Sequence, residues 1–390
     1  MKTLDDFKLK GKRVLIRIDL NASIINEKVQ NSLRFKEHAK TIKGLSGKGG
    51  RIVVLGHQGK KGSKDYLENL EQHAKILSRL IGKKVKYVDD LFGKQAVGDI
   101  EGMKDCEIIL LKNVRSFRGE VENISALKHS QGKFVKSLKR YFDLFVQDAL
   151  SICHRNHASV VGFAKVLPSC GGRVLEKELE GIGKVEGKIK KPFVLVLGGR
   201  KTEDYLEVIK KYVKEGKVDY ILTTGFLSFL GHISKGVDFG FKNKALGNEL
   251  KLISKLRKFE SKFVLPVDFA VDVKGGRKEL KIEEFPSKYD VLDIGSESIR
   301  QYAKIIKNAK TIFVKGSAGN YEKRGFEKGT KMILKEVGKS KGFSLVGGGD
   351  TLTGVEKYKI KGINHVSLSG GALLKYLGGE KLPGLEVLNV

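Results

Sequence analysis

The chain has 390 residues, of which 40% are hydrophobic, and this length predicts two domains with packed cores. We find no run of the ~18 apolar residues that a membrane helix needs and no apolar signal segment, so we expect a cytoplasmic protein with no membrane partner. Lys and Arg (75) outnumber Asp and Glu (45), which gives a formal charge of +30. Such a charge favours anionic small substrates or nucleic acid, or it reflects a lysine-rich proteome without a specific partner.

The three cysteines, Cys106, Cys153 and Cys170, form no C-x-x-C pair and lie in apolar segments. Cysteine in such segments usually behaves as a small hydrophobic residue. We therefore expect neither a disulfide nor a zinc site.

Apolar runs of strand length recur along the chain, and most are followed by a helical pattern. In chain order the predicted strands are 14–20, 51–56, 85–88, 107–111, 144–146, 193–198, 220–224, 263–267, 311–314, 343–346 and 364–368. Amphipathic stretches such as 66–81 and 297–309 predict helices between them. This alternation is typical of βαβ units and parallel sheets.

The predicted fold is α/β, with two Rossmann-like lobes, each a mostly parallel, doubly wound sheet. Pro168 and Gly171-Gly172 interrupt the pattern, so we expect lobes at 1–170 and 171–376. The charged stretch 173–184 should form a hinge helix that joins the lobes and is buried in neither. Ligands of such sheets bind beyond the carboxyl ends of the strands.

The predicted strand ends of the first half carry cationic and polar side chains. These are Asp19, Asn21, Arg34, His57, Lys60, Arg115, His154, Arg155 and His157. A single Arg or His of this kind is usually a surface ion pair or a core residue. A set at one sheet edge predicts a pocket for a small phosphorylated acid, because guanidinium groups match carboxylate and phosphate oxygens in pairs.

The predicted strand ends of the second half carry glycine instead. The clusters are Gly198-Gly199 with Lys201, Thr223 to Gly225, Gly316 with Gly319, Gly347-Gly348-Gly349-Asp350-Thr351, and Ser369-Gly370-Gly371. Glycine turns let backbone N–H groups approach phosphate, although each cluster alone could be a tight turn. Asp350 could hold Mg²⁺. The repetition suggests a nucleotide site. Two common nucleotide motifs are absent from the sequence. Gly338-Lys339-Ser340 resembles the end of a P-loop, but Ile333 stands where the first glycine of that motif should be, and no G-x-G-x-x-G follows a predicted strand.

These segments together resemble the phosphoglycerate kinase family, and its archaeal branch in particular. The resemblance runs from about Val14 to Glu386 and rests on VLIRIDLN, GHQG, KNVR, QDA with CHRNHAS, VGFAKVLPS, VLGGRK, LDIG, GSAGNYE, VGGGDT, SGGALLKYL and KLPGLE. It implies a monomeric phosphotransferase of glycolysis and gluconeogenesis that moves a phosphoryl group between ATP and 3-phosphoglycerate, with Mg²⁺. Its lobes would close over the substrates, and the tail at about 377–390 would return to the N-terminal lobe.

The resemblance also implies which residues act. The 3-phosphoglycerate site would comprise Asp19, Asn21, Arg34, His57, Gln58, Gly59, Lys60, Arg115 and Arg155. The nucleotide site would comprise Gly198, Gly199, Lys201, Glu322, Gly347, Gly348, Gly349, Asp350 and Thr351, with Asp350 as the metal ligand. Arg34, Lys201 and the backbone N–H groups of Gly370 and Gly371 would stabilise charge on the transferring group.

Several positions depart from the family pattern. Lys60, Ser116, Gln147 and Arg200 are substitutions that we expect to be tolerated. Lys315 and Ser317 stand at the Asn and Pro of the N-G-P turn, Leu368-Ser369 replace Thr-Gly, and Tyr205 stands where many members have lysine. Lys315 could supply compensating charge beside the phosphates. The alternative is a weakened homologue that binds nucleic acid non-specifically through its positive charge.

Overall fold

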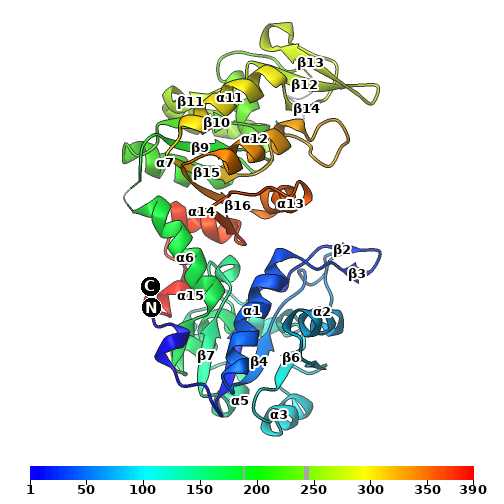
Figure 1. Ribbon diagram of the computed structural model, residues 1–390, viewed down its shortest axis with the longest axis vertical. Helices are drawn as coiled ribbons and strands as arrows, with labels where there is room; N and C mark the ends of the chain where they lie inside the picture. Colours follow the sequence, from blue (N-terminus) through cyan, green and yellow to red (C-terminus); the bar gives the residue numbers. More distant parts are fainter. Residues whose placement is uncertain (188, 241–245) are drawn as a thin grey trace. The chain divides into compact units, whose positions relative to one another are not determined.

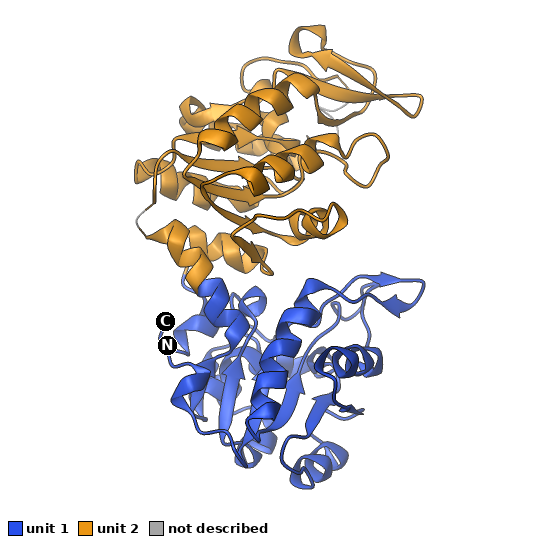
Figure 2. Ribbon diagram, in the orientation of Figure 1, with its two compact units in different colours: residues 1–179, 381–390 blue, residues 180–380 orange. Residues whose placement is uncertain are grey.

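The structure is a computed structural model that describes residues 1–187, 189–240 and 246–390. It divides into two compact units, Met1–Leu179 with Lys381–Val390, and Glu180–Glu380 (Figure 2). Among the described residues, no helix combines the length and the apolar character needed to span a bilayer.

The first unit is built on a six-stranded sheet with the order β5-β6-β4-β1-β7-β8, in which every neighbouring pair is parallel. Its strands are β1 (Arg13–Arg17), β4 (Arg51–Leu55), β5 (Val85–Val88), β6 (Ile108–Leu111), β7 (Leu144–Gln147) and β8 (Ser169–Gly171). The helices are α1 (Leu33–Gly47), α2 (Glu71–Ile81), α3 (Lys94–Glu101), α4 (Ala126–Ser130), α5 (Lys133–Leu138) and α15 (Pro383–Glu386), and a short hairpin pairs β2 (Ile24–Ile25) with β3 (Lys28–Val29).

Both faces of this sheet are buried, and successive residues of a strand pack into two different hydrophobic cores, one on each face. Val14 and Ile16 of β1 pack in the cluster that contains residues of α1 and α2, whereas Leu15 packs in the cluster that contains residues of α3 and α5. Side chains alternate between the two faces of a strand, so a strand covered on both sides must be apolar throughout. This explains why the sequence reads as continuous apolar runs.

The second unit repeats this architecture with the strand order β11-β10-β9-β15-β16-β17, again with every neighbouring pair parallel. Its strands are β9 (Phe193–Leu197), β10 (Tyr220–Thr223), β11 (Phe263–Val264), β15 (Thr311–Lys315), β16 (Phe343–Gly347) and β17 (His365–Ser367). Its helices include α7 (Leu206–Lys214), α8 (Gly225–Ile233), α10 (Ile253–Leu256), α11 (Ser296–Asn308), α12 (Lys328–Lys339), α13 (Gly349–Lys357) and α14 (Gly371–Leu377). Figure 1 labels α7, α11, α12, α13 and α14. The α/β class with two parallel sheets is confirmed.

Strand order reverses once in each sheet. In the first unit β4 lies on one side of β1 and β7 on the other, and in the second unit β10 and β15 flank β9 in the same way. The loops that follow the central strands diverge at such a point and leave a crevice at the carboxyl edge of the sheet. The functional side chains are therefore sought after β1 and β7, and after β9 and β15.

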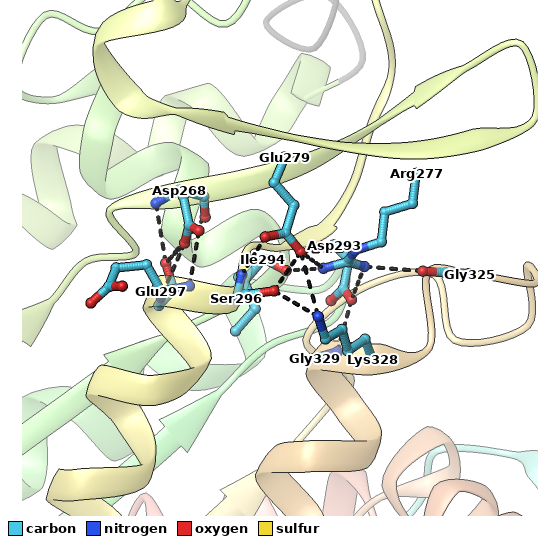
Figure 3. Close-up of polar contacts among 11 residues, drawn as sticks. Asp268, Arg277, Glu279, Asp293, Ile294, Ser296, Glu297, Gly325, Lys328 and Gly329 are labelled. Carbon is cyan, nitrogen blue, oxygen red and sulfur yellow. Dashed lines mark hydrogen bonds and ion pairs between the residues drawn. The ribbon is translucent and has the colours of Figure 1, made fainter.

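The second unit also contains a small antiparallel sheet that the sequence patterns did not predict. It consists of β12 (Asp268–Val273), β13 (Gly276–Lys281) and β14 (Val291–Ile294). Its carboxylates accept hydrogen bonds at helix N-termini: Asp268 from the Ser298 N–H at the start of α11 (2.8 Å), and Asp293 from the Gly329 N–H at the start of α12 (2.8 Å). Figure 3 shows these contacts, which join the small sheet to two helices of the main layer.

Two helix predictions need correction. The helix predicted from residue 66 begins at Glu71, where the Asn69 side chain accepts a hydrogen bond from the Glu71 N–H (2.8 Å). The helix predicted at 173–184 is α6 (Arg173–Glu186), and it is not solvated all round, because Val174, Leu175, Ile182 and Val185 are at most 6% exposed. The charged residues of this segment dominate its composition, but its apolar residues recur at helical spacing and form one buried face.

Candidate functional sites in the two units

The predicted acidic and basic residues after β1 meet in one cluster. Arg34, near the start of α1, forms an ion pair with Asp19 (Nε to Oδ2, 3.3 Å) and donates to the Asn21 carbonyl oxygen (3.0 Å). The Ser151 hydroxyl donates to Asp19 (2.6 Å), so the segments after β1 and β7 are joined where the strand order reverses. Burial alone would raise the pKa of Asp19, but the Arg34 cation and hydrogen bonds from Ser151 and the Asn21 N–H lower it well below its usual range, so Asp19 is a carboxylate.

The loop after β4 is held beside this cluster by its own backbone and amide groups. The Gly59 N–H donates to the Asn21 side chain (2.8 Å), and the Gly59 carbonyl oxygen accepts from Arg115. Gln58 is fully buried and exchanges two hydrogen bonds with the Ala22 backbone (2.9 and 3.0 Å). Gln58 therefore positions the loop. The Lys60 side chain, in contrast, is exposed to solvent.

A buried arginine that sequence reasoning missed lies beneath this cluster. Arg17, the last residue of β1, is 1% exposed; its Nη2 contacts His57 Nδ1 (3.2 Å) and its Nε donates to the Ser159 hydroxyl (2.8 Å). Ser159 in turn donates to the carboxylate of Glu120, which is 0% exposed (2.6 Å). The available signal was a cationic residue inside an apolar strand, which is costly unless it is paired.

Arg17, Arg115 and Arg155 lie close together in this cluster, so their positive charges repel one another. Burial, together with Arg155 and Arg17, lowers the pKa of Arg115 to about 10. Burial and the same three arginines lower the pKa of His157 to about 3 and that of His57 well below its usual value, so both histidines are neutral near pH 7. A cluster in which cations repel one another is stabilised by a bound anion.

The second unit contains a pocket of about 550 Å³ at the carboxyl edge of its sheet. The turns after β9, β10 and β15 contribute Gly199, Gly225, and Gly316 to Gly319. Of the residues expected to bind nucleotide, Gly199, Lys201, Glu322 and Asp350 line this pocket. Sequence reasoning missed its apolar lining of Phe226, Phe229, Phe269, Val291 and Leu292, which lie on or near α8 and the small sheet.

Of the other expected nucleotide residues, Gly349 is exposed, whereas Gly198, Gly347, Gly348 and Thr351 are buried where the glycine turns pack together. The Gly198 N–H donates to the Lys315 carbonyl oxygen (2.9 Å), and the buried Thr351 hydroxyl accepts from the Gly316 N–H (2.8 Å). Gly348 has a φ of +95°, and a Cβ on Gly370 would lie 3.6 Å from the Gly348 Cα. Gly347 and Gly349 flank Gly348 at the start of α13, and Gly371 begins α14. Four strand ends thus place glycine turns side by side.

Five carboxylates line this pocket: Asp204, Asp290, Asp293, Glu322 and Asp350. Asp350, in the first turn of α13, is exposed. The described residues contain no group of three His, Cys, Asp or Glu side chains that could hold a metal by themselves. One or two carboxylates fit Mg²⁺ that also binds phosphate oxygens, which is how this ion is usually held in phosphoryl-transfer sites.

The small sheet supports the far wall of the pocket. Arg277 donates to Asp293 (2.8 Å), to the Ile294 carbonyl oxygen (2.8 Å) and to the Gly325 carbonyl oxygen (3.1 Å), as drawn in Figure 3. Residues 291 to 294 line the pocket, so these contacts fix part of its surface. Burial raises the pKa of Asp293 to about 6, although Gly329 and Arg277 oppose that change.

Two parallel sheets, one with an arginine cluster and one with a glycine-lined pocket at its carboxyl edge, define a two-unit α/β phosphotransferase. The comparisons with known proteins agree. The profile of the phosphoglycerate kinase family matches residues 4–380. The chain belongs to the phosphoglycerate kinase family.

Curated relatives and solved structures resemble the whole chain. The phosphoglycerate kinase of Archaeoglobus fulgidus is 38% identical over 397 residues, covering 100% of this chain and 96% of the relative, and that of Pyrococcus furiosus is 39% identical with 100% and 98% coverage. The crystal structure of the Pyrococcus horikoshii phosphoglycerate kinase has a TM-score of 0.95 at 35% identity, covering 100% of this chain and 98% of the other. The Coxiella burnetii enzyme has a TM-score of 0.81 at 28% identity, with the same coverage.

Proposed function

We propose that this chain catalyses reversible phosphoryl transfer between ATP and 3-phosphoglycerate. A carboxylate oxygen of 3-phosphoglycerate attacks the γ-phosphorus of ATP, the bond from that phosphorus to the β,γ-bridging oxygen breaks, and ADP leaves with the electron pair. The products are 1,3-bisphosphoglycerate and ADP, and no proton is exchanged. Such a transfer needs alignment and charge stabilisation more than covalent help from the protein.

The arginine cluster of the first unit is the observation that carries this proposal. We assign the 3-phosphoglycerate site to this cluster, comprising Asp19, Asn21, Arg34, His57, Gln58, Gly59, Lys60, Arg115 and Arg155, with Arg17 beneath it. Arg34 already pairs with Asp19, so its guanidinium is oriented before substrate arrives. The neutral histidines add donors without adding charge repulsion.

The pocket of the second unit is assigned to the nucleotide. The phenylalanine side chains suit the base, Glu322 suits the ribose hydroxyls, and the glycine turns with Lys201 suit the phosphates. Asp350 would hold Mg²⁺, which when bound neutralises charge on the phosphate oxygens. Gly198, Gly199, Gly347, Gly348, Gly349 and Thr351 shape the turns, and the N–H groups of Gly370 and Gly371 are assigned to the transferring group.

The test is a coupled assay of the full chain with Mg²⁺, ATP and 3-phosphoglycerate. Arg34→Ala should lower kcat/KM by ~10³-fold or more, as with other arginines of phosphoryl transfer. Arg79→Met, an exposed arginine on α2, is the matched control and should leave the rate unchanged. A wild-type rate no higher than that of Arg34→Ala would refute the proposal.

Calorimetry then tests the two sites separately. 3-Phosphoglycerate alone and Mg·ADP alone should each bind the wild-type chain, and Arg34→Ala should weaken only the first. No observation on the fold or the sites favours the alternative of a nucleic-acid-binding homologue.

A further inference from the structure

Lys315 occupies an unusual position at the end of β15. Its carbonyl oxygen accepts a hydrogen bond from the Gly198 N–H, so the backbone is fixed between two glycine turns. Its side chain lines the pocket and crosses Gly348, since a Cβ on Gly348 would lie 2.7, 2.8 and 3.0 Å from Lys315 Cδ, Cε and Nζ. The ammonium lies 5.7 Å from the centre of the Tyr205 ring.

The Tyr205 ring forms a fixed platform for this ammonium. Tyr205 is 2% exposed, and its hydroxyl donates to the Gly198 carbonyl oxygen. A cation over an aromatic face is attracted by the ring, but the ring offers no hydrogen-bond acceptor to the three N–H donors of the ammonium. Tyr205 therefore orients the side chain of Lys315 without consuming its hydrogen bonds.

The charge of Lys315 is not matched by an adjacent carboxylate. In the part of the chain that the structure describes, no Asp or Glu lies within ion-pair distance of its Nζ; Asp204 and Asp350 act only from farther away, and Lys201 opposes them. Burial accordingly lowers the pKa of the ammonium. A half-buried cation without a counter-ion is costly unless a ligand supplies the negative charge.

We infer that Lys315 binds the phosphate chain of a nucleoside di- or triphosphate, as a second ammonium beside Lys201. This inference rests on the proposed function, because it assumes that the pocket holds the nucleotide. The surroundings match the assignment: Lys201 and Gly316 line the same pocket as Lys315, and Asp350, which also lines it, stands two residues beyond Gly348. Gly348 also must lack a side chain for Lys315 to reach across it.

The test is isothermal calorimetry of the full chain with ADP, Mg·ADP and adenosine as probes. Lys315→Met keeps the length of the side chain and removes its charge. It should weaken ADP binding 10- to 100-fold, the range for a hydrogen bond to a charged group, and leave adenosine within about twofold of wild type. Lys315→Arg should recover most of the loss in ADP affinity.

The control for lost positive charge is Lys335→Met, an exposed lysine on α12, which should bind ADP as the wild type does. If Lys315→Met does not fold, Lys315→Gln takes its place and carries the same expectation. Unchanged ADP affinity, or an equal loss for ADP and adenosine, would overturn the inference and leave the proposed function intact. A folded wild-type chain that binds no ADP would overturn both.

Discussion

The buried link between Arg17 and Glu120 should be a major source of stability in the first unit. Two hydrogen bonds in series, of 2.8 and 2.6 Å through Ser159, place the charges no more than about 5.5 Å apart. At an effective dielectric constant of about 20, that separation gives an attraction of about 3 kcal/mol. Burial favours the protonated form of Glu120, and Arg17 opposes this effect.

We predict that Arg17→Met lowers the free energy of unfolding by about 3–5 kcal/mol at pH 7, because it removes the cation with the largest effect on the buried Glu120 carboxylate. Glu120→Gln should also destabilise the protein. The double variant should lose less than the sum of the two single losses, with a coupling energy near the estimated attraction. At pH 5 the cost of Arg17→Met should shrink, because Glu120 can then take up a proton.

The assay is urea unfolding of the full chain, followed by circular dichroism. Hydrogen exchange of the β1 and β7 amides assigns the transition to the first unit. Arg79→Met serves as the surface control and should change stability by less than about 0.5 kcal/mol. A coupling energy below about 0.5 kcal/mol would show that the two charges do not stabilise each other.

Three further predictions concern a glycine, a histidine and the metal. Gly316→Ala should lower ADP affinity at least tenfold by calorimetry, because its φ is +87° and a Cβ would collide with the Gly198 carbonyl oxygen; unchanged affinity would contradict this geometry. Burial lowers the pKa of His73 from 6.5 to about 4. As the pH falls, His73 is therefore protonated in the unfolded chain before it is protonated in the folded chain. Stability should then drop between pH 6.5 and 4 by up to about 1.4 kcal/mol per pH unit, and His73→Gln should reduce that slope in urea titrations. Asp350→Asn should abolish the gain in ADP affinity on adding Mg²⁺ while sparing metal-free ADP binding; an unaltered gain would exclude Asp350 as the ligand.

The sequence predicted the parallel sheets because their chemistry is local. A strand covered on both faces must be apolar along its length, and glycine or charge marks the place where it ends, so β9 and β15 could be located from their own residues. The small antiparallel sheet was missed because β12 has only three consecutive apolar residues, at 269–271, and β13 is polar except for Gly276 and Leu280, so neither shows the apolar run or the alternation that marks a strand.

The residues that were missed at the sites depend on distant partners. Arg17 can be buried only because Ser159 and Glu120 lie beside it, and both are more than a hundred residues away in the chain. Likewise, Lys315 and Tyr205 are separated by 110 positions, and their stacking follows from the adjacency of β9 and β15. The sequence pattern identified Lys315 and Tyr205 as unusual, but only the folded chain brings their side chains together.

The first unit contains both ends of the chain, and this has a consequence for synthesis. Leu382, Leu385 and Leu388 are buried within this unit, and the Gly384 N–H donates to the Cys153 carbonyl oxygen (2.8 Å). On the ribosome, residues 1–179 emerge early yet lack that apolar patch until residues 381–390 have emerged, whereas residues 180–380 emerge as one uninterrupted block. The block can complete its core on the nascent chain, while the earlier segment must wait for residues 381–390.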